Sequence, residues 1–204
     1  MAKNNIVSFG LRNVHYAKAT QSDTGSWTFA TPVAFPGAQE FTSDIIGGST
    51  TVRADDIVVA QLNQNGGRTL TLKVTEVPVD FKKDILGYKE TAEGNLVEIT
   101  NAPVVTFALG VEFQGDVKAR RVWYYLCNVT PINEATKSKA ESIEANSITL
   151  NITVRPIAIN DEDYTTHVIA SKGDSNYETF LSVAPVVPEI NYLWKRQLKS
   201  VRAN

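Results

Sequence analysis

The sequence has little of the side-chain chemistry on which most enzymes depend. Among its 204 residues there are a single cysteine, Cys127, and two histidines, His15 and His167. One cysteine excludes an internal disulfide and a zinc site built from several thiolates. The sequence also contains no phosphate-binding loop motif and no GxSxG or HExxH motif. We therefore expect a protein that is not an enzyme and that uses no cofactor or metal ion.

The sequence also lacks an excess of charge of either sign. Twenty Lys and Arg residues face 22 Asp and Glu residues, for a formal net charge of -2. This balance offers no generally basic surface for nucleic acid. The total hides an asymmetry, because the four basic residues and Glu189 that follow Pro188 carry +3, which leaves -5 for the residues before them.

Long apolar runs are missing as well. The longest uncharged stretch near the middle, residues 100–111, is about half as long as a membrane-spanning helix requires. Residues 1–9 lack the apolar segment of a signal peptide. We therefore expect a protein that is made in a cytoplasm and does not enter a membrane.

What the sequence does contain is apolar and polar residues alternating with period two, interrupted by turn residues. The clearest case is 147–154, where four apolar side chains alternate with Ser, Thr and Asn. Glycines within 63–67 predict a hairpin turn. The other strands are expected at 14–20, 38–46, 57–62, 69–77, 104–113, 117–129 and 166–170. This pattern predicts a mainly β protein, an antiparallel β-sandwich or barrel, with both faces of 117–129 covered.

One short helix is expected to flank the sheets, at residues 79–86. Pro78 precedes it, and Gly87 is suited to its end. Phe81 and Ile85 fall on one face, so the helix depends on packing against the sheets. A second short helix is expected at 176–183.

Two segments are predicted to lie outside the regular strands. The first is a long polar inter-strand loop at 47–56, which contains Gly47, Gly48, Arg53, Asp55 and Asp56. The second is an extended C-terminal arm at 185–204, after a main domain at 1–184. The arm's candidate contact residues are Trp194, Lys195, Arg196, Lys199 and Arg202. Three roles remain open for this arm: docking on a neighbouring acidic subunit, a frayed terminus and nucleic-acid binding.

Several segments, in their order and spacing, resemble siphophage major tail tube proteins. They are Phe9–Ala17, Thr31–Ala38, Ala54–Val59, Val79–Gly87, Phe107–Arg121 and Glu144–Thr153. The resemblance spans roughly residues 6 to 160 and does not include the C-terminal part.

The resemblance implies a structural virion protein without enzymatic activity. In that family, a β-sandwich with a flanking helix forms hexameric rings, and the rings stack into a hollow tail tube. The fold is shared with type VI secretion tube proteins. The implied partners are further copies of the chain, the tape-measure, tail-terminator and distal tail proteins, and DNA as a transient, non-specific passenger. The implied location is the virion tail, after synthesis in the host bacterial cytoplasm.

Strand positions suggest which residues would serve such a tube. A lining that lets DNA slide should be acidic or neutral, because basic side chains bind phosphates. We therefore expect Glu40, Asp44 and Glu112 to line the channel, and the 47–56 loop to contact the adjacent ring.

Two alternatives remain open from the sequence. Trp27, Trp123, Tyr124 and Tyr125 are compatible with a β-sandwich that binds carbohydrate, although core and interface packing explains such residues more often. A related bacterial secretion or bacteriocin tube would have the same features as a phage tube.

Overall fold

The computed structural model describes residues 10–54, 57–114, 119–132, 147–160 and 163–189. The protein is mainly β, with antiparallel sheets and one short helix among these residues. In chain order the elements are β1 (Leu11–Gln21), β2 (Trp27–Phe29), β3 (Val33–Ala34), β4 (Ala38–Ala54), β5 (Ile57–Val74), α1 (Val79–Asp84), β6 (Lys89–Glu90), β7 (Leu96–Val97), β8 (Phe107–Phe113), β9 (Arg120–Val129), β10 (Ile148–Val154), β11 (Ile157–Ala158), β12 (Tyr164–Thr165) and β13 (His167–Ser171).

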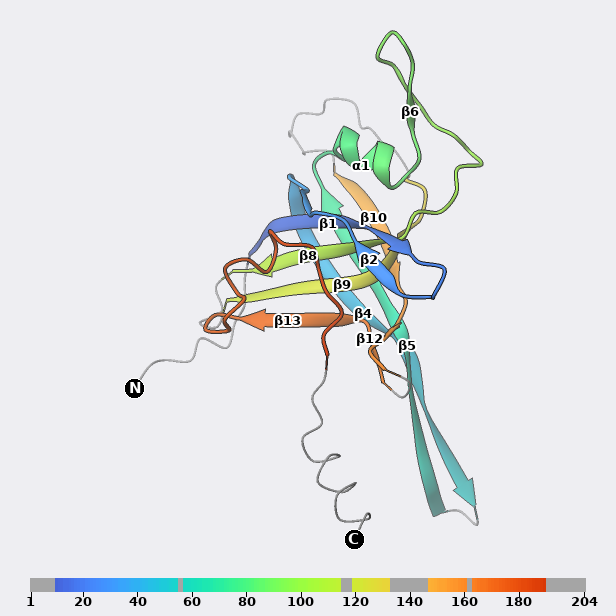
Figure 1. The fold of residues 1–204 in the computed structure, drawn as a ribbon. Coiled ribbons are helices and arrows are strands. Elements are labelled where there is room, and N and C mark those ends of the chain that lie inside the picture. Colours follow the sequence, from blue (N-terminus) through green and yellow to red (C-terminus); the bar gives the residue numbers. More distant parts are fainter. Residues whose placement is uncertain (1–9, 55–56, 115–118, 133–146, 161–162, 190–204) are drawn as a thin grey trace, which may run out of the picture.

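The main sheet changes direction at β9. Its strand order is β2-β1-β8-β9-β10-β5-β4. One edge of β9 pairs with β8, and the other edge is shared between β13 at residues 120–124 and β10 at residues 127–129. Leu126, with φ 39°, lies between these two pairings. As a result, β10, β5 and β4 cross the layer formed by β1, β8 and β9, as Figure 1 shows. The arrangement is consistent with the expected β-sandwich.

The larger core cluster lies between the two layers. Leu70, Leu72 and Leu150 contribute to it from one layer, and Phe107 and Leu109 from the other. Inward side chains alternate along each strand because strand side chains point to opposite faces in turn. The burial of this cluster therefore follows the period-two pattern of the sequence.

The helix α1 packs on this core through one aromatic side chain. The Phe81 ring meets Tyr16, Phe35 and Phe107 edge-on, with centroids 5.0 to 5.5 Å apart. The Tyr16 hydroxyl also donates a hydrogen bond to Asp84 at 3.1 Å. The predicted helix at 79–86 is thus confirmed, two residues shorter at its end.

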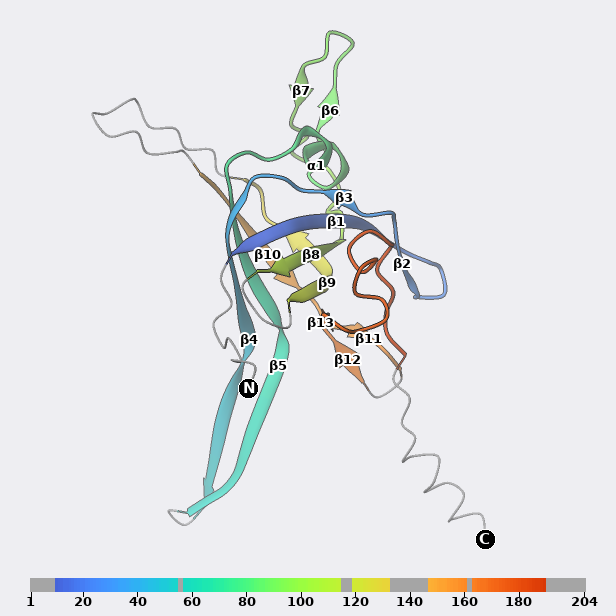
Figure 2. The same cartoon turned by 90° about the vertical axis from the view of Figure 1, so that its left-hand side faces the viewer.

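A second cluster lies on the opposite face of β8 and β9. Residues 174–189, which we call the C-terminal strap, cover this face (Figure 2). The Trp123 indole donates to the Phe180 carbonyl at 2.7 Å, and the Tyr125 hydroxyl donates to the Val186 carbonyl at 2.8 Å. The prediction that both faces of the strand at 117–129 are covered is therefore confirmed for β9.

Gly110 is the point of closest packing in this second cluster. A Cβ atom there would lie 2.8 Å from both Leu181 and Trp123. We expect Gly110→Ala to lower the free energy of unfolding by about 1–3 kcal/mol through overpacking. Gly48→Ala is the matched control, since its Cβ would meet nothing within 4 Å. Urea unfolding of both variants checks this, and equal stabilities would contradict the packing argument.

The predicted second helix at 176–183 is wrong. The strap instead forms successive turns, with bonds such as Phe180 N–H to the Tyr177 carbonyl at 3.3 Å. Its carbonyls are used by β9: Tyr177 accepts from Arg121, and Phe180 accepts from Trp123. Side chains of the sheet thus bind carbonyls that a helix would use internally.

The predicted loop at 47–56 and hairpin turn at 63–67 are also wrong. Residues 47–54 continue strand β4, and they pair with residues 57–65 of a single strand β5. Ala54 pairs with Ile57, so the chain reverses between them; residues 55–56 lie outside the described residues. The paired segments 47–54 and 57–65, which we call the β4–β5 arm, project from the body (Figures 1 and 2).

The glycines that suggested a turn serve a β-bulge instead. Ile46 pairs with Gly67 and Gly47 with Asn65, so Gly66 is the extra residue. Gly67 has φ +141°, and a Cβ there would lie 2.4 Å from the Val154 carbonyl oxygen. Gly66 is therefore needed for the bulge, and Gly67 for the close approach to the Val154 backbone. The sequence had suggested a chain reversal at these positions.

Candidate assembly surfaces

The outer face of β10, β5 and β4 is polar across all three strands. The register places the exposed residues of β10 beside alternate residues of β5, and these beside alternate residues of β4. We call this surface the polar face; it consists of Thr149, Asn151, Thr153, Thr69, Thr71, Lys73, Glu40, Thr42 and Asp44. The intervening residues, such as Leu70 and Leu150, point into the core. The face therefore follows from strict alternation on adjacent strands.

Two of the three predicted lining residues lie on the polar face. Glu40 and Asp44 are both exposed. Glu40 forms an ion pair with Lys73 at 2.5 Å, and Asp44 lies opposite Thr69. Two carboxylates and one ammonium give the face a net charge of -1, which offers little attraction to a phosphate backbone.

Sequence reasoning missed the residues that β5 contributes to this face. Thr69, Thr71 and Lys73 alternate with buried Leu70 and Leu72. This alternation is as regular as that of 147–154 and was a sufficient signal for a polar face. The pairing of the two strands, which makes their faces continuous, is visible only in the structure.

Glu112, the third predicted lining residue, does not face solvent. Its side chain is 0% exposed and contacts Arg12, Asn13 and Arg121. The Arg12 guanidinium donates at 2.6 and 2.8 Å, Asn13 Nδ2 at 2.7 Å and Arg121 Nε at 3.1 Å. The cause is the register, in which Arg12, Glu112 and Arg121 are direct neighbours across β1, β8 and β9. The predicted channel role of Glu112 is therefore wrong.

These donors also decide the protonation state of Glu112. Burial by itself raises the carboxyl pKa, but the hydrogen bonds from Asn13 and Arg12 and the charges of Arg121 and Arg12 lower it further than burial raises it. The net pKa is below the usual value. The carboxylate is thus ionised at neutral pH, and Arg121 links it to the strap through the carbonyls of Tyr177 and Glu178.

The β4–β5 arm is the second candidate surface. Gly47, Gly48 and Arg53, predicted in a loop, lie in β4, whereas Asp55 and Asp56 fall outside the described residues. Because the arm's strands pair with each other, the arm is a two-stranded ribbon away from the core. Such ribbons are marginal alone in water. The arm therefore gains from a partner surface.

Apolar side chains are exposed at both ends of the arm. Ile45 and Ile46, at its root, are 59% and 41% exposed, and Ile57, beside the reversal, is 68% exposed. Exposed isoleucines on a projecting ribbon are a feature of interaction surfaces.

The outer edge of β4 is the third candidate surface. Among the described residues no strand pairs with this edge, which runs for 17 residues. Natural edge strands are protected by charged residues, prolines, bulges or shortness. β4 contains neither Lys nor Pro, but it does contain Glu40, Asp44 and Arg53 and has irregular pairing with β5 at three points. An edge of this length and composition is a template for pairing with another chain.

The C-terminal candidates cannot be assigned to any of these surfaces. Trp194, Lys195, Arg196, Lys199 and Arg202 lie outside the described residues. The predicted arm at 185–204 nevertheless begins on the body, because Val186 accepts the Tyr125 hydrogen bond and Val187 packs on the second cluster.

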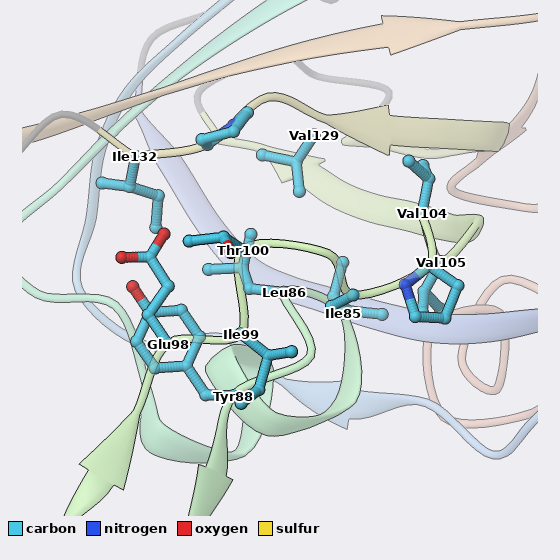
Figure 3. A pocket seen from close by; sticks show the side chains of 13 residues that line it. Ile85, Leu86, Tyr88, Glu98, Ile99, Thr100, Val104, Val105, Val129 and Ile132 are labelled. Atoms are coloured by element: carbon cyan, nitrogen blue, oxygen red, sulfur yellow. The ribbon is translucent and has the colours of Figure 1, made fainter.

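A small cavity lies between residues 85–88, which follow α1, and residues 98–105 and 129–132 (Figure 3). It measures about 130 Å³, and its lining is mostly aliphatic, including Ile85, Leu86 and Val129, with Glu98 and Tyr88 also present. A larger space of about 420 Å³ lies under the strap beside Trp123.

Several of the chemistry-bearing side chains that the sequence suggested are buried. Cys127 is buried, and desolvation raises the pKa of its thiol well above the ordinary value. Of the four aromatic residues that suggested carbohydrate binding, Trp123, Tyr124 and Tyr125 are buried, and Trp27 is partly buried and packs on the second cluster. In the described part of the chain, no three His, Cys, Asp or Glu side chains gather as metal ligands would. No helix there has the length and apolar character to cross a membrane.

Comparisons with known proteins add no assignment. A scan of protein-family models found no match for this chain. A search of curated proteins found no matching relative.

Proposed function

We propose that the chain is the major tail tube subunit of a bacteriophage, a structural virion protein that assembles into stacked hexameric rings. The observation that carries the proposal is the junction of three surfaces on β4. The same strand contributes Glu40 and Asp44 to the polar face, leaves its outer edge unpaired among the described residues and extends into the β4–β5 arm. Each surface fits one requirement of a hollow tube.

The edge of β4 within the body, at residues 38–46, provides the contact within a ring. If the neighbouring copy pairs with this edge, the polar faces of successive copies become one continuous surface. A head-to-tail contact of this kind closes into a ring when its rotation closes. The weakly acidic polar face then lines the channel, where DNA passes without binding tightly.

The β4–β5 arm provides the contact between rings. It projects from the body at the end opposite to the β6–β7 hairpin, as both views show (Figures 1 and 2). A second head-to-tail contact, independent of the first, extends rings into a filament. The partners are therefore other copies of this chain, with tape-measure, tail-terminator and distal tail proteins in the virion tail. The host bacterial cytoplasm is the site of synthesis.

A secretion-system or bacteriocin tube is the second candidate, since the same three surfaces would serve it equally. The genes that neighbour this one distinguish the two. Terminase, portal and tape-measure genes indicate a phage, whereas secretion or bacteriocin genes overturn the phage assignment. The carbohydrate-binding alternative is less favoured, because three of its four aromatic residues, Trp123, Tyr124 and Tyr125, are buried, which leaves only the partly buried Trp27.

Reversing the charge of the polar face tests its role in the channel. We expect the double variant Glu40→Lys and Asp44→Lys to fold and assemble, but to bind DNA with a strong dependence on salt concentration. Its matched control is Glu93→Lys with Glu98→Lys, which makes the same charge change at exposed positions outside the polar face. DNA retention by assembled tubes, measured across salt concentrations, checks this. Equal retention by both variants would contradict the lining assignment.

A further inference from the structure

The root of the β4–β5 arm contains the only Asn-Gly pair of the sequence, Asn65-Gly66. We propose that Asn65 is a site of spontaneous deamidation, which alters the arm at the point where it leaves the body. The proposal goes beyond tube assembly and rests on chemistry that is independent of it.

The reaction needs only groups of the chain and water. The backbone nitrogen of Gly66 loses its proton to water or hydroxide and forms a bond to the side-chain carbonyl carbon of Asn65. The carbon–nitrogen bond of the carboxamide breaks, and its nitrogen takes up a proton from water and leaves as ammonia. The resulting five-membered imide is then opened by one water molecule to aspartate or isoaspartate. Overall, an amide and water become a carboxylate and ammonium, with no oxidation or reduction. Glycine favours the attack because it has no Cβ beside the attacking nitrogen.

The side chain of Asn65 is held in a geometry that suits this attack. The Gly67 N–H donates a hydrogen bond to Asn65 Oδ1 at 3.4 Å. A carboxamide oxygen bound by the amide two residues further on is folded back along its own backbone, which brings its carbonyl carbon toward the intervening nitrogen. The same N–H lies where negative charge develops on this oxygen during attack, and it stabilises that charge.

The bulge gives the Gly66 backbone a conformational freedom that a residue paired in a regular strand lacks. Gly66 has no partner in the β4–β5 ladder, because Ile46 pairs with Gly67 and Gly47 with Asn65. A bulged residue is left out of ladder pairing. Asn65 is also exposed, so water reaches the imide once it forms.

The products change the arm's root in two ways. Both add one negative charge at residue 65. Isoaspartate also adds one carbon to the backbone within β5, between the arm and the close contact of Gly67 with Val154. Because strand side chains alternate with period two, an extra backbone atom there disturbs the register of residues 57–65 with β4.

Peptide mass spectrometry of the full-length, folded protein, stored at neutral and at mildly alkaline pH, tests the proposal. Asn95 and Asn151, which are exposed but followed by Leu96 and Ile152, are internal comparators. We expect Asn65 to convert at least about tenfold faster than either, since its attacking nitrogen belongs to a glycine and is prealigned. Conversion no faster than that of Asn151, or conversion only in urea-unfolded protein, would overturn the proposal.

Two variants test the chemistry of the attack. Gly66→Ala places a Cβ 3.3 Å from the Ile46 carbonyl oxygen, a tight but not severe contact, and we expect it to slow the conversion. Asn65→Gln keeps the carboxamide but requires a six-membered ring, and we expect it to abolish the conversion at this position even if Gly66→Ala fails to fold. An unchanged rate in folded Gly66→Ala, or conversion in the Asn65→Gln variant as fast as in the wild type, would each contradict the mechanism.

Discussion

Replacing Glu112 with alanine is expected to lower the free energy of unfolding by about 3–5 kcal/mol. The change removes a carboxylate that is 0% exposed and leaves Arg121, only 13% exposed, without its charge partner. It also removes the acceptor of Asn13 Nδ2 and of the Arg12 guanidinium. Breaking one side of a buried ion pair costs more than the pair contributes, because the remaining charge stays desolvated.

The chain offers a matched control for this variant. Glu40→Ala removes the same side chain from an ion pair with Lys73 whose two members are 58% and 43% exposed. Exposed pairs contribute about 0–1 kcal/mol, so we expect Glu40→Ala to be nearly neutral. Urea unfolding of both variants measures the difference. Two variants of equal stability would contradict a structural role for the Glu112 cluster.

The same carboxylate gives stability a defined pH dependence. Its folded pKa is lowered, so its contribution is present above the unfolded pKa of about 4.3 and is lost as the pH falls through the folded value. We therefore expect the stability difference between wild type and Glu112→Gln to shrink on acidification from neutral pH. A difference that grows toward acid pH would contradict the sign of this shift.

Deleting the β4–β5 arm is expected to abolish tube growth while leaving the body folded. A two-residue Asn-Gly turn would join Ile46 to Gly67, replacing residues 47–66. The core loses little, because its buried β5 residues, such as Leu70 and Leu72, lie beyond the deletion. The arm pairs only with itself among the described residues, so its removal opens no strand of the body.

Two kinds of measurement distinguish loss of the contact between rings from loss of the fold or of the contact within a ring. Circular dichroism and thermal unfolding report the body, and electron microscopy reports rings and tubes. We expect closed rings without long tubes. Normal tubes from the deleted protein would show that the arm is not the contact between rings. A matched control is Gly48→Ala, which alters the arm at an open position and should leave assembly unchanged.

The sequence predicted those parts of the fold in which local pattern and tertiary environment agree. The strand at 147–154 was predicted closely because one face is buried and the other exposed, which period-two alternation reveals directly. The helix at 79–86 was predicted because Pro78 and Gly87 mark its ends and Phe81 needs a core. Both cases depend on residues close together in the chain.

The failures occur where distant segments decide the outcome. Gly66 and Gly67 have the composition of a turn, but their environment, including the carbonyl of Val154, makes them a bulge. The alternation of apolar and polar residues did not reveal that both faces of β8 are covered. One face packs between the two layers, and the C-terminal strap covers the other. Glu112 was therefore assigned to solvent, although its neighbours Arg12 and Arg121 come from two other strands.

The candidate surfaces show the same division. Glu40 and Asp44 were predicted on an exposed strand face, and they are exposed there. The edge of β4, unpaired among the described residues, could not be predicted, because strand order is set by pairings such as that of β10 with β5, far apart in sequence.

The most direct test of tube assembly is negative-stain electron microscopy of the purified full-length protein over a range of concentrations. We expect closed rings, and at high concentration stacked tubes of uniform diameter with a continuous central channel. In a reconstruction, β4 of one copy should pair along its outer edge with the next copy, and Glu40 and Asp44 should face the channel. A protein that stays monomeric at every concentration and forms neither rings nor tubes would contradict the proposed function.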